Sequence, residues 1–370
     1  MKQIVSVIAL LILILHTLFS QDPRLNSNGS GKSVAAAVLQ DNGIDYRAYR
    51  SSQDTSLTLY ANFIRPLHPG PVLVSMHGWH GAVQRYHPDD VKPALSGEWF
   101  LVQPEMRGRG NSEGKQDANG WELQDVVDAV EFAKKHYRDY ISDTNCIYIT
   151  GGSGGGGNVL GLIGKFPDYF CSAICEVGIS DYGLWYRHDR KGEFRDEMET
   201  HGWIGGTPDS NPEAYASRGG LTTLENLLTP LAMVYPEKDI RVPLEQGHNY
   251  LMKAEAIGKR GMIDYLELKG VGAVKGGGHW ENITPEQEAL RQEFVSRHLS
   301  KDYKPVEIPR QGRFVVAGFL KTKQFEVILS NIDNIAEVIY DLDKGEFKIL
   351  PASATKVLLT VKQPPRKGNQ

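Results

Sequence analysis

Three residue types that together can transfer an acyl group occur in order along the chain: Ser153, Asp239 and His279. A serine hydroxyl is a weak nucleophile until a base removes its proton, and histidine is the side chain that most often does so. A carboxylate beside the histidine holds the imidazole in the required tautomer and stabilises its cationic form. We therefore predict a catalytic triad with Ser153 as the nucleophile, Asp239 as the acid and His279 as the base.

Ser153 lies in a glycine-rich run, GGSGGGG, at positions 151–157. A flexible linker of this composition would have polar flanks. Here Cys146–Thr150 is apolar and β-branched, as in a buried strand, and Asn158–Phe166 has apolar residues at helical spacing. A phosphate-binding loop would continue with Gly-Lys-Ser or Gly-Lys-Thr, which does not follow here. We therefore interpret the run as G-x-S-x-G, the sharp strand-to-helix turn that presents the serine of an α/β-hydrolase, in which acid and histidine follow in this order.

Acyl transfer also needs two N–H donors that converge where negative charge develops on the substrate oxygen. The residue after the nucleophile, Gly154, would supply one donor. The other would come from the loop after the predicted strand Val72–Met76, which has the sequence HGWHG at 77–81. We assign it to the backbone N–H of Trp79, whose indole could also form a wall of the pocket. The alternative, a tight turn with a buried tryptophan, can coexist with this role.

Other residues could take the predicted roles. Glu237 is the main rival acid, and His248 is a weaker rival base. His77 and His80 are three residues apart, but no carboxylate follows them at ligand spacing, so we predict no metal site. We also expect no cofactor.

The elements that must position these residues alternate between strand-like and helix-like runs from Tyr46 to Ser300. This pattern predicts an α/β fold with a mostly parallel central sheet and helices on both faces. The predicted strands are Leu57–Ile64, Val72–Met76, Trp99–Gln103, Cys146–Thr150, Ala173–Val177, Pro230–Tyr235 and Met262–Leu268. Further helices are predicted over Trp121–His136 and Leu244–Ile257, and from Thr284, where Thr-Pro-Glu-Gln forms a capping box.

The segment 181–218 breaks this alternation and is rich in Trp, Tyr, Gly and charged residues. We predict that it forms a lid or substrate wall, with a plain surface excursion as the alternative. Its aromatic residues Trp185, Tyr186 and Trp203 are candidate substrate-binding residues, and Tyr182 has the same character. All four could equally belong to the core.

After Lys301 the sequence changes to short β-type runs without helices, which predicts a small all-β domain. The predicted strands there are Gly312–Lys321, Gln324–Ser330, Ile335–Tyr340, Phe347–Leu350 and Lys356–Val361. The predicted organisation is a signal peptide at 1–20, an N-terminal segment at 21–45, the catalytic domain at 46–301, the β domain at 302–363 and a disordered tail at 364–370.

The ordered motifs resemble the catalytic domain of the prolyl oligopeptidase family, and its X-Pro dipeptidyl peptidase and acetyl-xylan esterase branches are similar. The resemblance covers about 46–300. It implies an α/β-hydrolase fold, the triad named above, and a place for Arg107 and Ser112 in the loop beneath the active site. The motifs are SMHGWHG, PEMRGRGNSEG, NGWELQDVVDAVEFAKKHY, GGSGGGGNVLGLIGKFPDYF, NPEAYASR and EKDIRVPLEQGHNYLMKAEAIG.

The sequence departs from the family pattern at several points. Glu105 stands where an aspartate is common, Tyr235-Pro236 replaces a small residue before the acid, and Gly154 replaces the aromatic residue that often follows the serine in the peptidases. The stretch 21–70 is too short for the β-propeller of the oligopeptidases. No acidic pair that would bind the amino terminus of a peptide can be identified.

Composition limits the compartment and the partners. The 370 residues carry a net charge of −4 without a basic cluster, which argues against nucleic acid as a partner. The N-terminus has one lysine and then an apolar stretch at 4–15, the form of a secretory signal peptide; an uncleaved membrane anchor is the alternative. We expect an exported protein, periplasmic or secreted, without a stable membrane span after signal cleavage.

Only three cysteines occur, so we expect an ordinary core rather than a disulfide scaffold. Cys146 would be a small buried hydrophobic residue. Cys171 and Cys175 would lie roughly 13 Å apart along a strand, so no bridge is expected between them.

Taken together, these features predict a serine hydrolase with an open aromatic pocket. Our first interpretation is an esterase whose substrate is an acylated carbohydrate or a similar small-molecule ester. The first alternative is a serine peptidase of the same family that hydrolyses short-peptide amides, and the second is a catalytically silent glycan-binding protein. The sequence does not indicate an oligomeric state.

Overall fold

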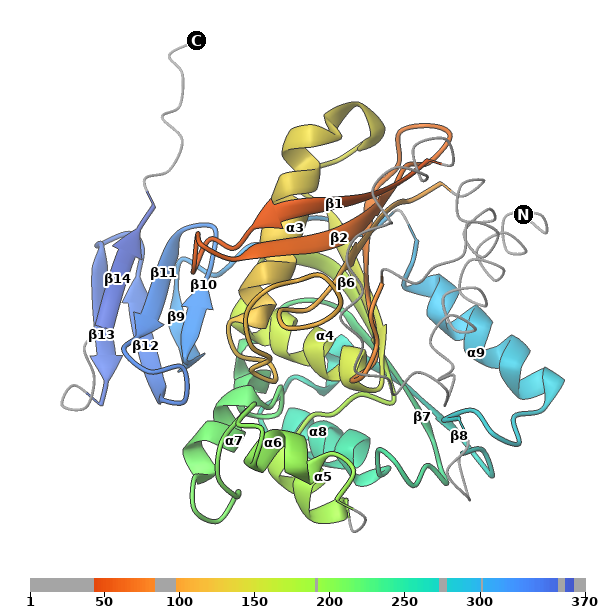
Figure 1. Ribbon diagram of the computed structural model, residues 1–370. Helices are drawn as coiled ribbons and strands as arrows, with labels where there is room; N and C mark the ends of the chain where they lie inside the picture. The colour runs from red at the N-terminus through yellow and green to blue at the C-terminus, as the bar shows by residue number, and fades with distance from the viewer. Residues whose placement is uncertain are drawn as a thin grey trace.

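The computed structural model describes residues 43–83, 98–189, 192–272, 278–300, 302–351 and 357–362. These residues form an eight-stranded sheet covered by helices and a separate six-stranded sheet near the C-terminus, as Figure 1 shows. The predicted fold class, an α/β-hydrolase fold with a small C-terminal β region, is confirmed. The predicted signal peptide and C-terminal tail lie outside the described residues.

The large sheet has the strand order β1-β2-β4-β3-β5-β6-β7-β8. Strands β1, β2 and β4 pair antiparallel, and the others pair parallel. Every residue of β3, β6 and β7 is buried, as expected for parallel strands covered on both faces. The strands are β1 (Ile44–Arg50), β2 (Thr58–Ile64), β3 (Val72–Met76), β4 (Phe100–Pro104), β5 (Ile147–Gly152), β6 (Phe170–Glu176), β7 (Leu231–Pro236) and β8 (Ile263–Leu268).

Strand β1 was not among the predicted strands, and it begins two residues before the expected start of the catalytic domain. Its sequence, IDYRAYR, buries only Ile44 and Tyr49. An edge strand obtains its hydrogen bonds from one neighbour, here β2, and most of its side chains stay in solvent. The local apolar pattern was therefore too weak to reveal it.

The helices pack on both faces of the large sheet. Neighbouring residues of β3 point to opposite sides, so Val74 belongs to the hydrophobic cluster beneath α3 (Glu122–His136), α4 (Gly154–Lys165) and α8 (Glu245–Ala256). Leu73 belongs to the cluster covered by α9 (Pro285–Arg297), which lies across the sheet from α3 and α4 in Figure 1. The predicted capping box at Thr284 and Gln287 is present at the start of α9.

The cysteines differ from expectation. Cys146 forms a disulfide with Cys171, whose Cα atom lies 5.4 Å away, and Cys175 is free and buried. Strands β5 and β6 are neighbours in the parallel sheet, and their pairing brings the two cysteines together. The Cys146–Cys171 bond was not predicted, because strand pairing cannot be read from sequence separation.

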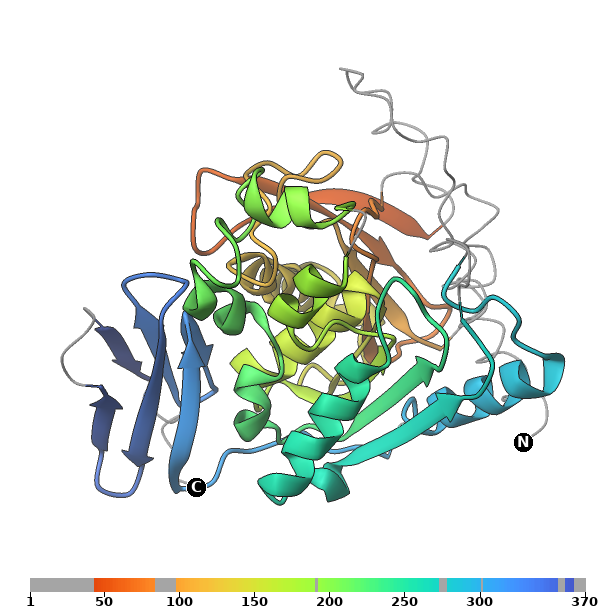
Figure 2. The same cartoon turned by 90° about the horizontal axis from the view of Figure 1, so that it is seen from below.

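The predicted insertion at 181–218, between β6 and β7, contains the short helices α5 (Tyr182–His188), α6 (Arg195–Glu199) and α7 (Pro212–Arg218). In Figure 1 they lie together at the lower side of the molecule, beside α4 and α8, and Figure 2 shows them from below. Tyr182 and Met198 belong to the same hydrophobic cluster as the sheet. The segment is therefore packed onto the catalytic domain.

The C-terminal sheet is entirely antiparallel, with the strand order β13-β12-β9-β10-β11-β14. One predicted strand, 312–321, is divided in two by Gly318, whose φ of 73° favours glycine. None of the helices within the described ranges is long and apolar enough to span a bilayer. The strands are β9 (Gln311–Ala317), β10 (Phe319–Lys321), β11 (Phe325–Leu329), β12 (Ile335–Asp341), β13 (Glu346–Leu350) and β14 (Val357–Val361).

Candidate active site

Ser153 lies at the turn between β5 and α4. Its backbone angles are φ 57° and ψ −124°, a conformation that residues with a side chain rarely adopt and that is found mostly at functional sites. The turn is held by two hydrogen bonds: Ser153 N donates to Glu176 O at 3.0 Å, and Gly157 N donates to Ser153 O at 3.0 Å. This arrangement matches the sharp turn that the G-x-S-x-G pattern predicts.

The glycines after Ser153 allow another loop to approach the start of α4. A Cβ atom on Gly154 would lie 2.6 Å from the backbone nitrogen of Trp79, and one on Gly155 would lie 2.6 Å from His77 O. Real Cβ atoms do not come this close to backbone atoms. The glycine run is therefore a packing requirement, and it places the two predicted oxyanion donors, Gly154 and Trp79, side by side.

Asp239 and His279 contact each other at the same edge of the sheet. Asp239 follows β7, is buried, and accepts hydrogen bonds at Oδ1 from Arg241 N (2.7 Å) and Val242 N (2.9 Å). Its other oxygen, Oδ2, contacts His279 Nδ1. Because β5, β7 and β8 run parallel, Ser153, Asp239 and His279 all lie beyond the carboxyl ends of strands, where the ligands of α/β sheets bind.

The two rival residues are engaged elsewhere. Glu237 accepts a hydrogen bond from Gly270 N at 2.8 Å and pairs with Lys269 at 3.3 Å, and these contacts hold its pKa below the usual value. His248 Nε2 lies 2.8 Å from Glu267 Oε2 on β8. In the structure, the carboxylate that contacts His279 is that of Asp239.

A model of the prolyl oligopeptidase family matches residues 99–301, more than half of the chain. The chain belongs to this family. It is 26% identical over 192 residues to an uncharacterized peptidase, YtmA, of Bacillus subtilis (strain 168), and the match covers 51% of this chain and 70% of that protein. Membership of this family identifies the protein as a serine hydrolase.

Solved structures share the fold at low sequence identity. An acylaminoacyl peptidase in complex with Z-Gly-Gly-Phe-chloromethyl ketone has a TM-score of 0.58 at 23% identity, covering 72% of this chain and 43% of that chain. The Pyrococcus horikoshii acylaminoacyl peptidase has a TM-score of 0.57 at 22% identity, with the same coverage. The chain thus spans less than half the length of these peptidases. The Pyrococcus furiosus esterase Pf2001 has a TM-score of 0.51 at 14% identity, covering 76% of this chain and 99% of that chain.

In this prolyl oligopeptidase-family protein, Trp79 is the centre of an aromatic cluster. Its ring lies 4.9 Å from both Trp185 and Trp203 and 5.9 Å from Tyr182. Trp185 is only 1% exposed and donates its indole N–H to Arg241 O at 2.8 Å. Trp185 thus has the core position that the sequence left open as its alternative, and its side chain packs against Trp79.

The other two aromatic candidates occupy different surroundings. Trp203 lines the pocket beside Trp79, as expected of a substrate wall. Tyr186 instead packs against Tyr215 and donates its hydroxyl to Glu199, both within the same insertion. It is not among the residues that line this pocket.

Two residues that the sequence did not reveal hold the loop at 77–81. Glu197, on α6, accepts a hydrogen bond from Trp79 Nε1 at 2.5 Å, and its Oε1 lies 2.8 Å from His80 Nε2. Arg109 donates to Trp79 O at 2.7 Å and places its guanidinium over the ring of Trp203, 4.6 Å from the centroid. Glu197 belongs to none of the motifs, and although Arg109 lies within PEMRGRGNSEG, nothing in that motif indicates a contact with the distant loop at 77–81.

Beside Trp79 and Gly154 lies a small pocket that is partly open to solvent. Apolar walls are formed by Trp79, Trp203 and Met106, and the polar side chains include Arg109 and Glu122. Since the two predicted oxyanion donors line this pocket, it adjoins the place where a reacting carbonyl would lie. Within the described ranges, no group of three or more His, Cys, Asp and Glu side chains is placed to hold a metal ion.

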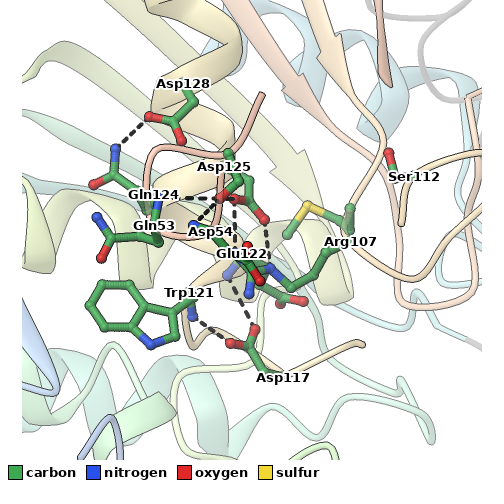
Figure 3. A network of polar contacts seen from close by, with 12 residues as sticks. Gln53, Asp54, Arg107, Ser112, Asp117, Trp121, Glu122, Gln124, Asp125 and Asp128 are labelled. Carbon is green, nitrogen blue, oxygen red and sulfur yellow. Dashed lines mark hydrogen bonds and ion pairs between the residues drawn. The ribbon is translucent and has the colours of Figure 1, made fainter. Parts of the chain in front are cut away.

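The loop between β4 and α3 contributes Met106, Arg109, Gln116 and Ala118 to the pocket lining and also contains Arg107 and Ser112. Arg107 forms a double hydrogen bond with Asp125 at 2.6 and 2.8 Å (Figure 3). Burial raises the pKa of Asp125 to about 6, although the Arg107 charge opposes this shift. Ser112 donates its hydroxyl to Glu105 O at 3.0 Å, and Asp117 accepts hydrogen bonds from the first backbone N–H groups of α3.

Proposed function

We propose that this protein is a serine peptidase of the prolyl oligopeptidase family that hydrolyses peptide amides through an acyl-enzyme at Ser153. The observation that carries this proposal is the contact between Asp239 and His279 at the sheet edge that also carries the strained serine turn. A buried carboxylate on Nδ1 fixes the tautomer of the imidazole and leaves Nε2 to act as the base.

The proposed chemistry has two half-reactions, and in each of them His279 acts first as a base and then as an acid. The Ser153 oxygen attacks the substrate carbonyl carbon while His279 takes the hydroxyl proton. The carbonyl electron pair moves to the oxygen, and the N–H groups of Gly154 and Trp79 donate hydrogen bonds to the negative charge that forms there. When the carbonyl re-forms, the C–N bond breaks and His279 gives the proton to the leaving amine. Water then attacks the acyl-enzyme in the same way and releases the acid.

The relatives favour an amide substrate over our first interpretation, an ester of an acylated carbohydrate. The family model, the Bacillus subtilis relative and the acylaminoacyl peptidases are all described as peptidases. An esterase remains the second candidate because Pf2001 matches this chain over 99% of its own length. A silent glycan-binding protein has no comparable support.

Matched substrates distinguish the two candidates. N-acetyl aminoacyl 4-nitroanilides and the corresponding 4-nitrophenyl esters share an acyl group and differ only in the bond that is cleaved. We expect the purified protein to hydrolyse both classes and Ser153→Ala to hydrolyse neither. Ester cleavage without any anilide cleavage, over a panel of acyl residues, would contradict the peptidase and favour the esterase.

The acid is tested with a pair of carboxylates that lie close in sequence. In Asp239→Asn the Oδ1 contacts with Arg241 and Val242 can remain, but the amide no longer holds His279 in the required tautomer. We expect kcat to fall by roughly 10⁴-fold. Glu237→Gln is the control and should stay within about threefold of the wild type, because Glu237 pairs with Lys269. If Glu237→Gln instead lowers kcat far more than Asp239→Asn does, Glu237 is the catalytic acid and Asp239 is not.

We also propose that the protein is exported. The N-terminal sequence has the form of a signal peptide, and the Cys146–Cys171 disulfide is the kind of bond that persists in oxidising compartments. Expression of the full chain in a bacterial host, with fractionation and mass spectrometry of the N-terminus, tests this. A full-length N-terminus in the cytoplasmic fraction would contradict it.

A further inference from the structure

The pocket beside Trp79 and Gly154 contains the guanidinium of Arg109, some of whose N–H donors form no hydrogen bond within the described ranges. Arg109 donates one hydrogen bond, to Trp79 O. In the part of the chain that the structure describes, no carboxylate forms an ion pair with it, and Glu197 and Glu122 act on it only at longer range. Burial lowers the pKa of this guanidinium. The guanidinium lies over the ring of Trp203, but without a carboxylate partner it keeps unused N–H donors, so a polar group in the pocket would gain by accepting hydrogen bonds from them.

The same pocket contains the carboxyl group of Glu122, of which only one oxygen accepts hydrogen bonds within the described ranges. Glu122 Oε1 accepts hydrogen bonds from Asn119 N at 2.7 Å and Asn158 Nδ2 at 3.4 Å. Across the described ranges, Oε2 accepts none. The pocket therefore offers unused donors at Arg109 and an unused acceptor at Glu122, between the apolar walls of Trp79 and Trp203.

The position of the pocket limits which part of a substrate could reach it. Gly154 and Trp79, the predicted oxyanion donors, are both part of its lining. A group in the pocket must therefore lie within a few bonds of the reacting carbonyl. In a peptide or an aminoacyl ester, the side chain of the residue that contributes the carbonyl lies at that distance.

We propose that this pocket is a specificity site for an acyl residue with a carboxamide side chain, asparagine or glutamine. The carboxamide oxygen accepts hydrogen bonds from Arg109, and its NH₂ group donates to Glu122 Oε2. A leucine of similar size leaves both groups unsatisfied, a lysine is repelled by the Arg109 charge, and an aspartate is repelled by the Glu122 charge when Glu122 is ionised. This inference rests on the proposed acyl-enzyme at Ser153.

The first test is the preference of the wild-type protein. The kcat/KM values of N-acetyl 4-nitrophenyl esters of Asn, Gln, Ala, Leu and Asp are compared. We expect Asn or Gln to exceed Leu by about tenfold or more, since a site built for polar groups discriminates against an apolar isostere. Equal values, or a preference for Leu, overturn the proposal. Esters are used because their hydrolysis does not require peptidase activity. A failure to cleave anilides would then contradict the proposed peptidase function and leave this test of specificity intact.

The second test separates substrate recognition from support of the loop. Arg109→Met removes the guanidinium, and we expect the ratio of kcat/KM for the Asn ester to that for the Ala ester to fall about tenfold. Glu197→Gln is the matched control: Glu197 contacts Trp79 from outside the pocket, so its substitution should lower both esters alike and keep the ratio. If Arg109→Met also lowers both esters alike, Arg109 only holds the loop and the proposal fails.

Discussion

At the scale of single residues, Ser153 depends on neighbours that have no side chain. Ser153 has a positive φ, and α4 begins directly after it. This leaves no space for further side chains between the turn and the loop at 77–81. Glycine in a helix costs up to about 1 kcal/mol relative to alanine, so four in succession at the start of α4 need a compensating reason. The close backbone contacts of Gly154 and Gly155 with that loop supply it.

This packing predicts a contrast between two alanine substitutions. A Cβ atom at Gly155 would lie 2.6 Å from His77 O and 2.7 Å from Met76 O, whereas one at Gly152 would meet only Glu176 O at 3.6 Å. We expect Gly155→Ala to lower the free energy of unfolding by about 1–3 kcal/mol, as overpacking does, and Gly152→Ala to change it little. Urea denaturation measures both. Equal effects would show that the loop can move away from α4.

Glu122 predicts a pH dependence of stability. Burial and the nearby Asp117 charge raise the pKa of Glu122 to about 7, from 4.5 as an exposed group. Between these values the folded protein binds more protons than the unfolded chain, so this residue lowers stability as pH rises. Glu122→Gln removes the titration. We expect the free energy of unfolding of Glu122→Gln, relative to that of the wild type, to increase from pH 5 to pH 8 by on the order of 1 kcal/mol or more.

Thermal denaturation of the two proteins at pH 5, 6, 7 and 8 gives the comparison. A stability difference that stays constant over this range would show that Glu122 is ionised throughout.

At the scale of elements, the short helix α6 acts on the loop that bears Trp79. The Glu197 carboxylate contacts both the Trp79 indole and the His80 imidazole, and His80 also stacks on Phe194 at 5.6 Å. The segment 181–218 therefore does more than cover the sheet, because it holds the element that we expect to supply an oxyanion donor.

Substitution of two glutamates on α6 tests whether this helix supports the loop that bears Trp79. Glu197→Ala removes both contacts with the loop, and we expect kcat to fall about tenfold with little change in KM, since a mobile donor weakens transition-state stabilisation. Glu199→Ala loses only the contact with Tyr186, within the insertion. We expect its kcat to remain close to that of the wild type. Similar losses in both variants would indicate a general effect of helix stability instead.

At the scale of the whole molecule, the C-terminal sheet is attached to the catalytic domain through buried contacts. Phe319 on β10 is fully buried and stacks on Trp121 at 4.7 Å, next to the start of α3. Asn226 exchanges two hydrogen bonds with the backbone of Val315, and Arg218 pairs with Asp333 at 2.7 Å. Such an interface predicts that the two parts unfold together.

Phe319→Ala tests this coupling. Loss of the buried ring should cost about 3–5 kcal/mol. If the parts unfold together, ester hydrolysis and far-UV circular dichroism will be lost at the same, lower denaturant concentration. Leu358→Ala, at a residue of β14 that is 60% exposed, is the control and should have little effect. A separate early transition that leaves ester hydrolysis intact would show that the β sheet unfolds independently.

The sequence alone determined the features that depend on neighbours along the chain. Seven central strands, the capping box at Thr284 and the glycine turn at Ser153 could be predicted because periodicity and turn chemistry are local. The tertiary structure alone decided the contacts between distant segments. These include the Cys146–Cys171 disulfide, the burial of Trp185, and the positions of Glu197 and Arg109 around Trp79. Such contacts depend on how strands pair and helices pack, which the local pattern of residue types does not encode.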